Sequence, residues 1–405
     1  MGKVVTPEWP QYDQREIDAV TEVVKSGKWG IGGPKIKEFE EKFAAYCGVK
    51  HGITAVNGTV TLRLALEALE VGPGDEVIVP GITFQATAAS VLDVNAVPVL
   101  VDVDPRTYTI DPVTVEAAIT PRTKCIIPVH LYGRVADMDS IMAIAKRHGL
   151  YVIEDCAHQH GSEWDGKKVG SIGNAGSFSL QAYKILSAGE GGILTTNDNR
   201  LYELLCSLRN IGTPIAPDAP AMQSGNYRMT EFQAAILLAQ MTRLDEQNLT
   251  RETNVLNMEQ KIMDIAGVNV LYRHPKITRQ SYFRWVLQYD RQAWEGIPLD
   301  IFLEALYAEL ENSIQCSRPY AQLNDSPMYR PHSKKTHRLS EEYWKAIDPK
   351  RFSLPISKKA VEEEAFCFYQ AILLADRKSC DNIADAIRKL RENTGELMEY
   401  YRKRV

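Results

Sequence analysis

Short, continuous apolar runs alternate with segments of helical periodicity over the first two thirds of the chain. The runs that predict strands are rich in Val, Ile and Leu, and they cover residues 76–80, 97–103, 125–129, 151–154, 175–180 and 192–195. Between several of them lie helical patterns such as residues 60–69 and 140–147. Strands without polar alternation are buried on both faces, so this order predicts an α/β fold whose mainly parallel sheet is covered by helices.

The alternation of strands and helices ends with a long predicted helix. This helix begins after the N-cap Thr230 and continues into the charged segment 243–251. Beyond about residue 255 the periodicity loosens into a smaller α+β region, which ends in a helical segment over residues 379–400. We therefore predict an N-terminal arm (1–25), a large domain (26–250) and a small C-terminal domain (251–405).

Composition narrows the class of protein. The chain has 405 residues and a formal net charge of −5, which gives no reason to expect nucleic-acid or membrane-surface binding. No window approaches the ~18 apolar residues of a membrane span, and the first residues lack the apolar run of a signal peptide. We expect a soluble, cytoplasmic protein. The seven cysteines form no CxxC pair, which argues against a disulfide framework or a zinc site, and we expect no metal.

Two charged residues in the middle of the chain point to one kind of chemistry. Asp155 ends an apolar strand run, and ligands of open α/β sheets lie beyond the carboxyl ends of the strands. Lys184 precedes a turn with Gly189, Gly191 and Gly192, in small and apolar surroundings. A lysine amine can hold an aldehyde as a Schiff base, and an aspartate can keep a ring nitrogen protonated. Alone, Asp155 suggests a cap or turn; together, the two residues predict a pyridoxal 5'-phosphate site.

Other residues fit the same cofactor. Gly58 and Thr59 lead onto a predicted helix, whose first backbone N–H groups suit a phosphate. Ser179, five residues before Lys184, offers a further hydroxyl. Phe84 follows a strand and can stack on a ring, and His158 lies three residues after Asp155. Taken singly, an aromatic residue such as Phe84 is more often a core residue, and His158 is as readily a satisfied interior histidine.

With these residues the chain resembles a known family, the DegT/StrS-type aminotransferases. Members of that family are pyridoxal phosphate enzymes of the aspartate-aminotransferase fold (fold type I) that act on keto-sugars and keto-cyclitols. The resemblance covers nearly the whole chain. The matching stretches are residues 55–69, 75–84, 99–111, 123–130, 153–161, 176–195 and 224–240.

The resemblance implies a role for each matching residue. Lys184 corresponds to the Schiff-base lysine and Asp155 to the partner of the pyridinium nitrogen. His158 lies where the family contacts the ring hydroxyl, and Phe84 where an aromatic residue stacks on the ring. The positions that match the phosphate site are Gly58, Thr59 and Ser179.

The resemblance also implies partners. Asn226 matches a residue that reaches the phosphate from a neighbouring subunit, which implies a homodimer with shared active sites. Trp29 and Tyr320 lie in segments that approach the substrate in such enzymes. Tyr183 departs from the family, which usually has a small residue before the lysine, and this bulk is expected to shape the acceptor pocket.

Segment 278–320 and the end of the chain most resemble cyclitol aminotransferases of aminoglycoside pathways, which transfer an amino group from L-glutamine to scyllo-inosose-like ketones. We therefore expect a ping-pong transamination from L-glutamine or L-glutamate to a keto-cyclitol or keto-sugar, with Lys184 carrying the cofactor as an internal Schiff base. Antibiotic or amino-sugar biosynthesis is the expected setting.

Two alternatives remain open at this stage. One keeps the cofactor but dehydrates, aromatises or oxidises a sugar-like substrate, as aminohydroxybenzoate synthases do; the family's dehydratase branch has His in place of Lys184 and is disfavoured. The other is a non-enzymatic ligand sensor, although such proteins often lose the lysine or the acid, and this chain keeps both. A nicotinamide dehydrogenase is excluded because no G-x-G-x-x-G follows a strand.

Overall fold

The computed structural model of the protein describes residues 2–314 and 316–404. Its larger sheet has seven strands in the order β1-β9-β8-β5-β4-β2-β3. Strand β9 runs antiparallel to both neighbours, β1 and β8, and the other neighbouring pairs are parallel. The strands are β1 His51–Ala55, β2 Glu76–Pro80, β3 Val97–Val101, β4 Thr123–Ile126, β5 Tyr151–Asp155, β8 Ala175–Ser179 and β9 Gly192–Thr196.

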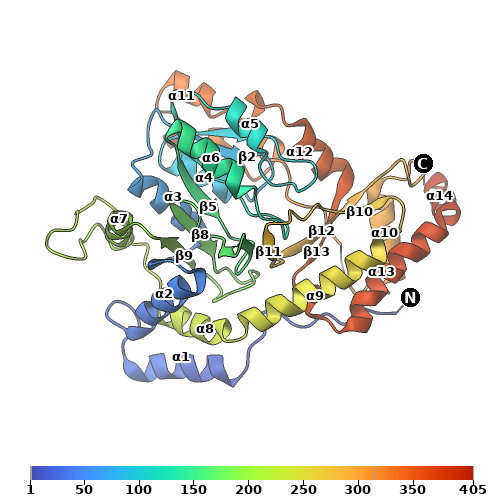
Figure 1. Ribbon diagram of the computed structural model, residues 1–405, viewed down its shortest axis with the longest axis horizontal. Helices are drawn as coiled ribbons and strands as arrows, with labels where there is room; N and C mark the ends of the chain where they lie inside the picture. Colours follow the sequence, from blue (N-terminus) through green and yellow to red (C-terminus); the bar gives the residue numbers. More distant parts are fainter. Residues whose placement is uncertain (1, 315, 405) are drawn as a thin grey trace.

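Helices cover both faces of this sheet, because its strands present apolar side chains alternately to either side (Figure 1). Ile78 packs in one core with α2, α6 and α8, whereas its neighbours Val77 and Val79 pack in the other with α3, α4 and α7. The helices of this part are α2 Pro34–Cys47, α3 Gly58–Ala68, α4 Ala86–Asp93, α5 Pro112–Ala117, α6 Met138–His148, α7 Asn199–Arg209 and α8 Glu231–Met241.

A second sheet lies in the C-terminal third, with the antiparallel order β10-β12-β13. Trp285 and Phe368 of its strands pack in a third core with α9, α10 and α13. The elements here are α9 Leu244–Ile262, β10 Val268–Val270, β12 Arg284–Tyr289, α10 Leu299–Glu309, α11 Glu341–Ala346, α12 Pro355–Lys359, β13 Ala365–Tyr369, α13 Arg377–Glu392 and α14 Thr394–Arg402.

A small third sheet, β11-β6-β7, joins the two parts of the chain. Strands β6 Glu163–Trp164 and β7 Lys167–Lys168 follow β5, and β11 Ile277–Arg279 precedes β12. Ile277 pairs with Trp164, and Ser281 N donates to Ser162 Oγ at 2.8 Å. The segment after Asp155 is thereby fastened to the segment before β12.

The N-terminal segment packs along the helices instead of projecting from them (Figure 1). Helix α1 Gln14–Ser26 is held to the body by Glu16, whose carboxylate accepts from Arg243 Nη1 at 2.8 Å and from Gln240 Nε2 at 2.8 Å. Val4 is buried in the third core. Helix α9 crosses the predicted boundary at residue 250 without a break; the division into arm, large and small domains stays a prediction.

Most predicted elements are present with nearly the expected bounds. Thr230 is the N-cap of α8, its N–H donating to Gln233 Oε1 at 2.9 Å, but the long helix expected after it is divided, because α8 ends at Met241 and α9 begins at Leu244. Strand β1 was not predicted. The helical segment expected over residues 379–400 is present as two helices, because α13 ends at Glu392 and Asn393, with φ of −111° and ψ of 32°, interrupts the helix before α14. None of the described helices is both long and apolar enough to cross a bilayer.

Candidate active site

A pocket of about 710 Å³ opens beyond the carboxyl ends of the central strands of the large sheet. Residues that follow β2, β5 and β8 form one side of it, and residues from β12 and the segment around 320 form the other. This position agrees with the rule for open α/β sheets. The predicted site residues that line the pocket together are Gly58, Thr59, Phe84, Asp155, His158, Ser179, Tyr183, Lys184 and Tyr320.

Asp155 is the last residue of β5 and its side chain is buried. Thr87 Oγ1, on α4, donates to its Oδ2 at 2.8 Å, and Ala157 N donates to its Oδ1 at 3.1 Å. Burial raises the pKa of Asp155, and the hydrogen bond from Thr87 opposes that shift. The carboxylate is thus fixed in orientation at the pocket floor, where a cationic N–H group would compensate its charge.

Lys184 lies in the connection between β8 and β9, which backbone hydrogen bonds hold in shape. Ala182 N donates to Gly189 O at 2.8 Å, and Lys184 N donates to Gln181 O at 2.8 Å. The side chain is only 8% exposed, and its Nζ lies 4.2 Å from the centroid of the Phe283 ring.

Burial lowers the pKa of Lys184 from 10.5 to about 7. The negative charge of Asp155 opposes this shift, and the positive charge of Arg284 adds to it. A large share of the amine is therefore uncharged near neutral pH, the form in which a lysine attacks an aldehyde.

The start of α3 forms an anion cradle at one end of the pocket. Asn57 is the N-cap, and its side chain accepts from Val60 N at 2.9 Å. The N–H groups of Gly58 and Thr59, in the first turn, have no carbonyl partner within the helix. A Cβ at Gly58 would lie 2.7 Å from Ser179 Cβ, so only glycine allows this close approach. The corner suits a phosphate group.

His158 and Tyr320 contact each other across the pocket. His158 Nε2 lies 3.1 Å from Tyr320 Oη, and burial holds the pKa of His158 well below its usual value, so the ring is neutral. Burial also raises the pKa of Tyr320 to about 12. His158 Nδ1 is buried without a partner among the described residues. The Phe84 ring lies 5.7 Å from that of Tyr320.

Two predicted site residues lie outside the pocket of their own chain. Trp29 is 54% exposed and packs against Phe232 with 5.9 Å between ring centroids. Asn226 is exposed, in the α7–α8 connection, part of which projects from the body (Figure 1). Tyr183, at the pocket mouth, is 63% exposed, and its carbonyl accepts from Tyr369 Oη at 2.8 Å.

The sequence did not single out several residues at the pocket. Among them are Phe283 and Arg284, which form part of the pocket wall, and Thr87, which does not line the pocket but donates a hydrogen bond to Asp155. A threonine in a helix carries no distinguishing signal. Phe283 and Arg284 lie far downstream of Lys184 and reach the pocket only through the pairing of β12 with β13.

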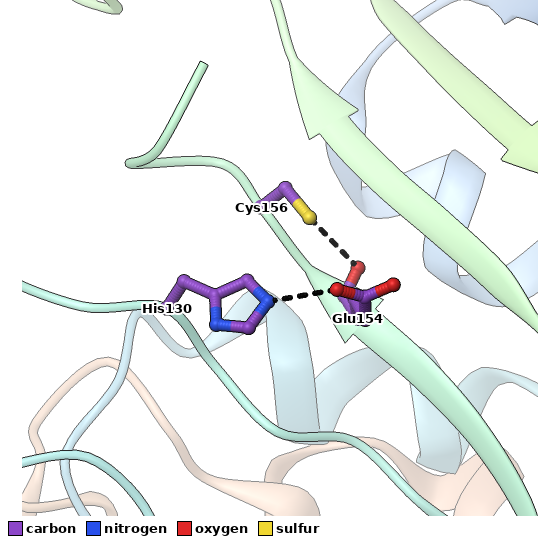
Figure 2. A group of neighbouring side chains, drawn as sticks. All are labelled: His130, Glu154 and Cys156. Atoms are coloured by element: carbon purple, nitrogen blue, oxygen red, sulfur yellow. Dashed lines mark hydrogen bonds and ion pairs between the residues drawn. The ribbon is translucent and has the colours of Figure 1, made fainter. Parts of the chain in front are cut away.

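A buried cluster behind Asp155 anchors the end of β5. Figure 2 shows His130, Glu154 and Cys156, whose potential ligand atoms lie within 4.8 Å of one another. The Glu154 carboxylate accepts from His130 Nε2 at 3.1 Å and from the backbone of Gly170 at 2.9 Å, Ile172 at 2.7 Å and Gly173 at 2.8 Å.

The other groups of this cluster also have partners. His130 Nδ1 accepts from Ala136 N at 3.2 Å, so Nε2 carries the proton that Glu154 receives. Cys156 Sγ donates to the Glu154 carbonyl at 3.6 Å, as a packed thiol. With these atoms engaged, the cluster serves to fasten segment 170–173 to the strand that carries Asp155.

The sequence and the fold are similar to those of known proteins. Residues 10–372 match the DegT/DnrJ/EryC1/StrS aminotransferase family. The L-glutamine:2-deoxy-scyllo-inosose aminotransferase of Streptoalloteichus tenebrarius is 42% identical over 96% of this chain and 95% of its own length. The L-glutamine:scyllo-inosose aminotransferase of Streptomyces griseus is 39% identical over the same shares. The crystal structure of 3-amino-5-hydroxybenzoic acid synthase has a TM-score of 0.81 and 32% identity, covering 96% of this chain and 100% of that one.

Proposed function

This chain belongs to the DegT/DnrJ/EryC1/StrS aminotransferase family, and we propose that it transfers the amino group of L-glutamine to a keto-cyclitol. Its activity as a transaminase follows from the family, and the predicted fold of type I is confirmed by the solved structures it resembles. The observation that carries the proposal is the placement of Lys184 and Asp155 in one pocket with the anion cradle at Gly58.

The proposed substrates are inferred from the named activities of similar proteins. Curated proteins with 42% and 39% identity are named as L-glutamine aminotransferases of 2-deoxy-scyllo-inosose and scyllo-inosose, and each is matched along nearly all of its length. Both named acceptors are cyclic ketones. The aromatising alternative has weaker support, because 3-amino-5-hydroxybenzoic acid synthase shares only 32% identity with this chain. Biosynthesis of an aminocyclitol antibiotic is the proposed setting.

The pocket fits pyridoxal 5'-phosphate. Its donors and acceptors match the groups of the cofactor: an uncharged buried amine at Lys184, a buried carboxylate at Asp155, an unpartnered Nδ1 at His158 and the cradle at Gly58 and Thr59. When bound, the cofactor supplies an aldehyde that exchanges amino groups and a protonated ring that withdraws electrons from the α carbon of the donor.

Each side chain then has a defined task. Lys184 Nζ would bind the aldehyde covalently, and once displaced by the donor amine it would move the proton to and from the reacting carbon. Asp155 would hold the proton on the ring nitrogen, with Thr87 fixing its orientation. His158 Nδ1 would donate to the ring hydroxyl, and Phe84 would pack against the ring. The phosphate would bind at Gly58, Thr59 and Ser179.

A half-reaction experiment tests the proposal. Enzyme loaded with pyridoxal phosphate should change its visible absorbance when L-glutamine is added, and scyllo-inosose or its 2-deoxy form should restore the original spectrum. Lys184→Ala should show neither change. A wild-type spectrum that L-glutamine leaves unaltered, or that only nucleotide keto-sugars restore, would contradict the proposed pair of substrates. A product without a new amine, detected by mass spectrometry, would favour the aromatising alternative.

We propose further that the enzyme is a homodimer with shared active sites, in which Asn226 binds the phosphate held by the partner subunit. Asn226 is exposed and lies outside its own pocket. The exposed apolar side chains of Trp29, Ile31 and Tyr183 offer a surface that a second copy would cover.

Mixing two inactive variants tests the shared site. Lys184→Ala and Asn226→Ala homodimers should each be inactive or weak, and subunit exchange between them should restore activity, because each mixed dimer contains one pocket with both residues intact. A monomer in light scattering, or no restoration after proven exchange, would refute the arrangement.

A further inference from the structure

The pocket wall contains a cationic side chain, that of Arg284, which has no role in the proposed chemistry. The basic side chains among the described residues that line it are those of His158, which burial keeps neutral, Lys184 and Arg284. Lys184 would be occupied by the cofactor. Arg284, the first residue of β12, keeps its charge at any physiological pH.

The guanidinium of Arg284 is held in place by a hydroxyl group and a sulfur atom. Its Nη1 donates to Ser317 Oγ at 3.0 Å and to Cys367 Sγ at 3.1 Å. Its central carbon lies 5.5 Å from the centroid of the Tyr320 ring and 5.7 Å from that of Phe283. These contacts fix the plane of the group and leave it beside two residues of the pocket wall.

The remaining donors of Arg284 are not satisfied within the chain. Nε is buried without a hydrogen-bond partner, and within residues 2–314 and 316–404 the hydrogen bonds of this side chain go to Ser317 and Cys367, never to a carboxylate. A half-buried guanidinium without an anion is unfavourable, and its planar array of N–H groups matches a carboxylate in two-point contact. Together with its place in the pocket wall, this indicates a site for an anion.

The proposed reaction brings two anionic groups into the pocket. The cofactor phosphate has its own cradle at Gly58 and Ser179, at the start of α3. The other is the α-carboxylate of the amino-acid donor, whereas a keto-cyclitol carries none. We propose, on the basis of the function proposed above, that Arg284 binds the α-carboxylate of L-glutamine and that of the keto acid product. This contact would restrict the donors to amino acids.

Two analogues of glutamine separate this role from a structural one. 4-Aminobutanamide lacks the carboxylate but keeps the amine, and 4-carbamoylbutanoate lacks the amine but keeps the carboxylate. Arg284→Gln should weaken binding of 4-carbamoylbutanoate, measured by calorimetry on the holoenzyme, by roughly 100-fold. It should reduce kcat/KM of the half-reaction with L-glutamine to a similar extent, and leave the slow reaction with 4-aminobutanamide within about two-fold.

Matched variants complete the test. Arg279→Gln removes the same charge from an exposed side chain of β11 and should change none of these values. Arg284→Lys keeps the charge without the planar array and should recover part of the affinity. Equal losses for L-glutamine and 4-aminobutanamide in Arg284→Gln, or unchanged binding of 4-carbamoylbutanoate, would overturn the assignment.

The failure of the wider proposal would look different. If wild-type enzyme bound 4-carbamoylbutanoate in an Arg284-dependent way but showed no spectral change with L-glutamine, the carboxylate site would stand and the proposed donor would be wrong. If L-glutamine reacted and neither analogue distinguished wild type from Arg284→Gln, the donor would stand and the carboxylate site would be refuted.

Discussion

The amine of Lys184 should titrate near neutral pH in the cofactor-free protein. Its pKa is lowered from 10.5 to about 7, mainly by burial, a net shift that corresponds to about 5 kcal/mol against the ammonium form. At pH 7.5 about three quarters of the Lys184 amines would be uncharged, against about one in a thousand for a lysine with a pKa of 10.5. The pocket therefore prepares this one amine for condensation with an aldehyde.

Trace acetylation measures this titration directly, because acetic anhydride reacts with the uncharged amine. Cofactor-free protein would be labelled at pH values between 5.5 and 10.5, digested, and the extent of modification at Lys184 read by mass spectrometry. Lys37, whose side chain is 80% exposed, provides a reference in every digest. Labelling of Lys184 should reach half of its plateau near pH 7. Labelling that is negligible at pH 7.5 and still rises above pH 9 would refute the effect of burial.

Two variants test how neighbouring charges affect the pKa of Lys184, and the shifts expected for them have opposite directions. Asp155→Asn removes a negative charge that favours the ammonium, so the midpoint should fall. Arg284→Gln removes a positive charge that opposes it, so the midpoint should rise. Shifts of both variants in the same direction would show that the cause is not electrostatic.

Three further predictions concern stability and cofactor binding. Between pH 7 and 10.5 the unfolded chain would retain the Lys184 proton that the folded chain has released, so the stability of the cofactor-free protein should rise with pH across this window. Lys184→Met should raise the free energy of unfolding at pH 7 by up to about 4 kcal/mol, measured in urea titrations. A destabilised variant would contradict this prediction. Gly58→Val would place atoms against Ser179 and should weaken pyridoxal phosphate binding about 10-fold or more by fluorescence, whereas Gly395→Ala, where a Cβ meets open space, should not. Glu154→Gln would turn an NH₂ group toward buried N–H donors and should cost about 3–5 kcal/mol in thermal or urea unfolding; a loss below about 1 kcal/mol would argue against the anchor.

The sheet, and the placement of Lys184 and Asp155 beside its strand ends, could be predicted from the sequence because both follow from the local pattern of residues. Continuous apolar strands are buried on both faces, and Asp155 lies where its strand run ends. Strand β1 was missed because its apolar run is interrupted by Thr54, a buried polar residue whose N–H and hydroxyl both donate to Glu40 Oε1, at 2.8 and 2.7 Å. A partner that distant in sequence cannot be read from the strand itself.

The opposite wall of the pocket depends on contacts between distant segments. Arg284 faces the site because β12 pairs with β13, where Arg284 lies opposite Tyr369. Nothing in the residues around Arg284 marks it as different from the exposed Arg279. Asn226 and Trp29 illustrate a second limit, since their proposed roles require a surface supplied by another copy of the chain.

The clasp formed by β6 and β11 has a consequence for how substrates are admitted. The pairing of β6 with β11 connects the backbone that follows His158 to the backbone that precedes Arg284. The two sides of the pocket therefore cannot separate as rigid bodies without breaking the pairing of Trp164 with Ile277. The clasp therefore limits how far these two parts of the pocket lining can separate along this edge.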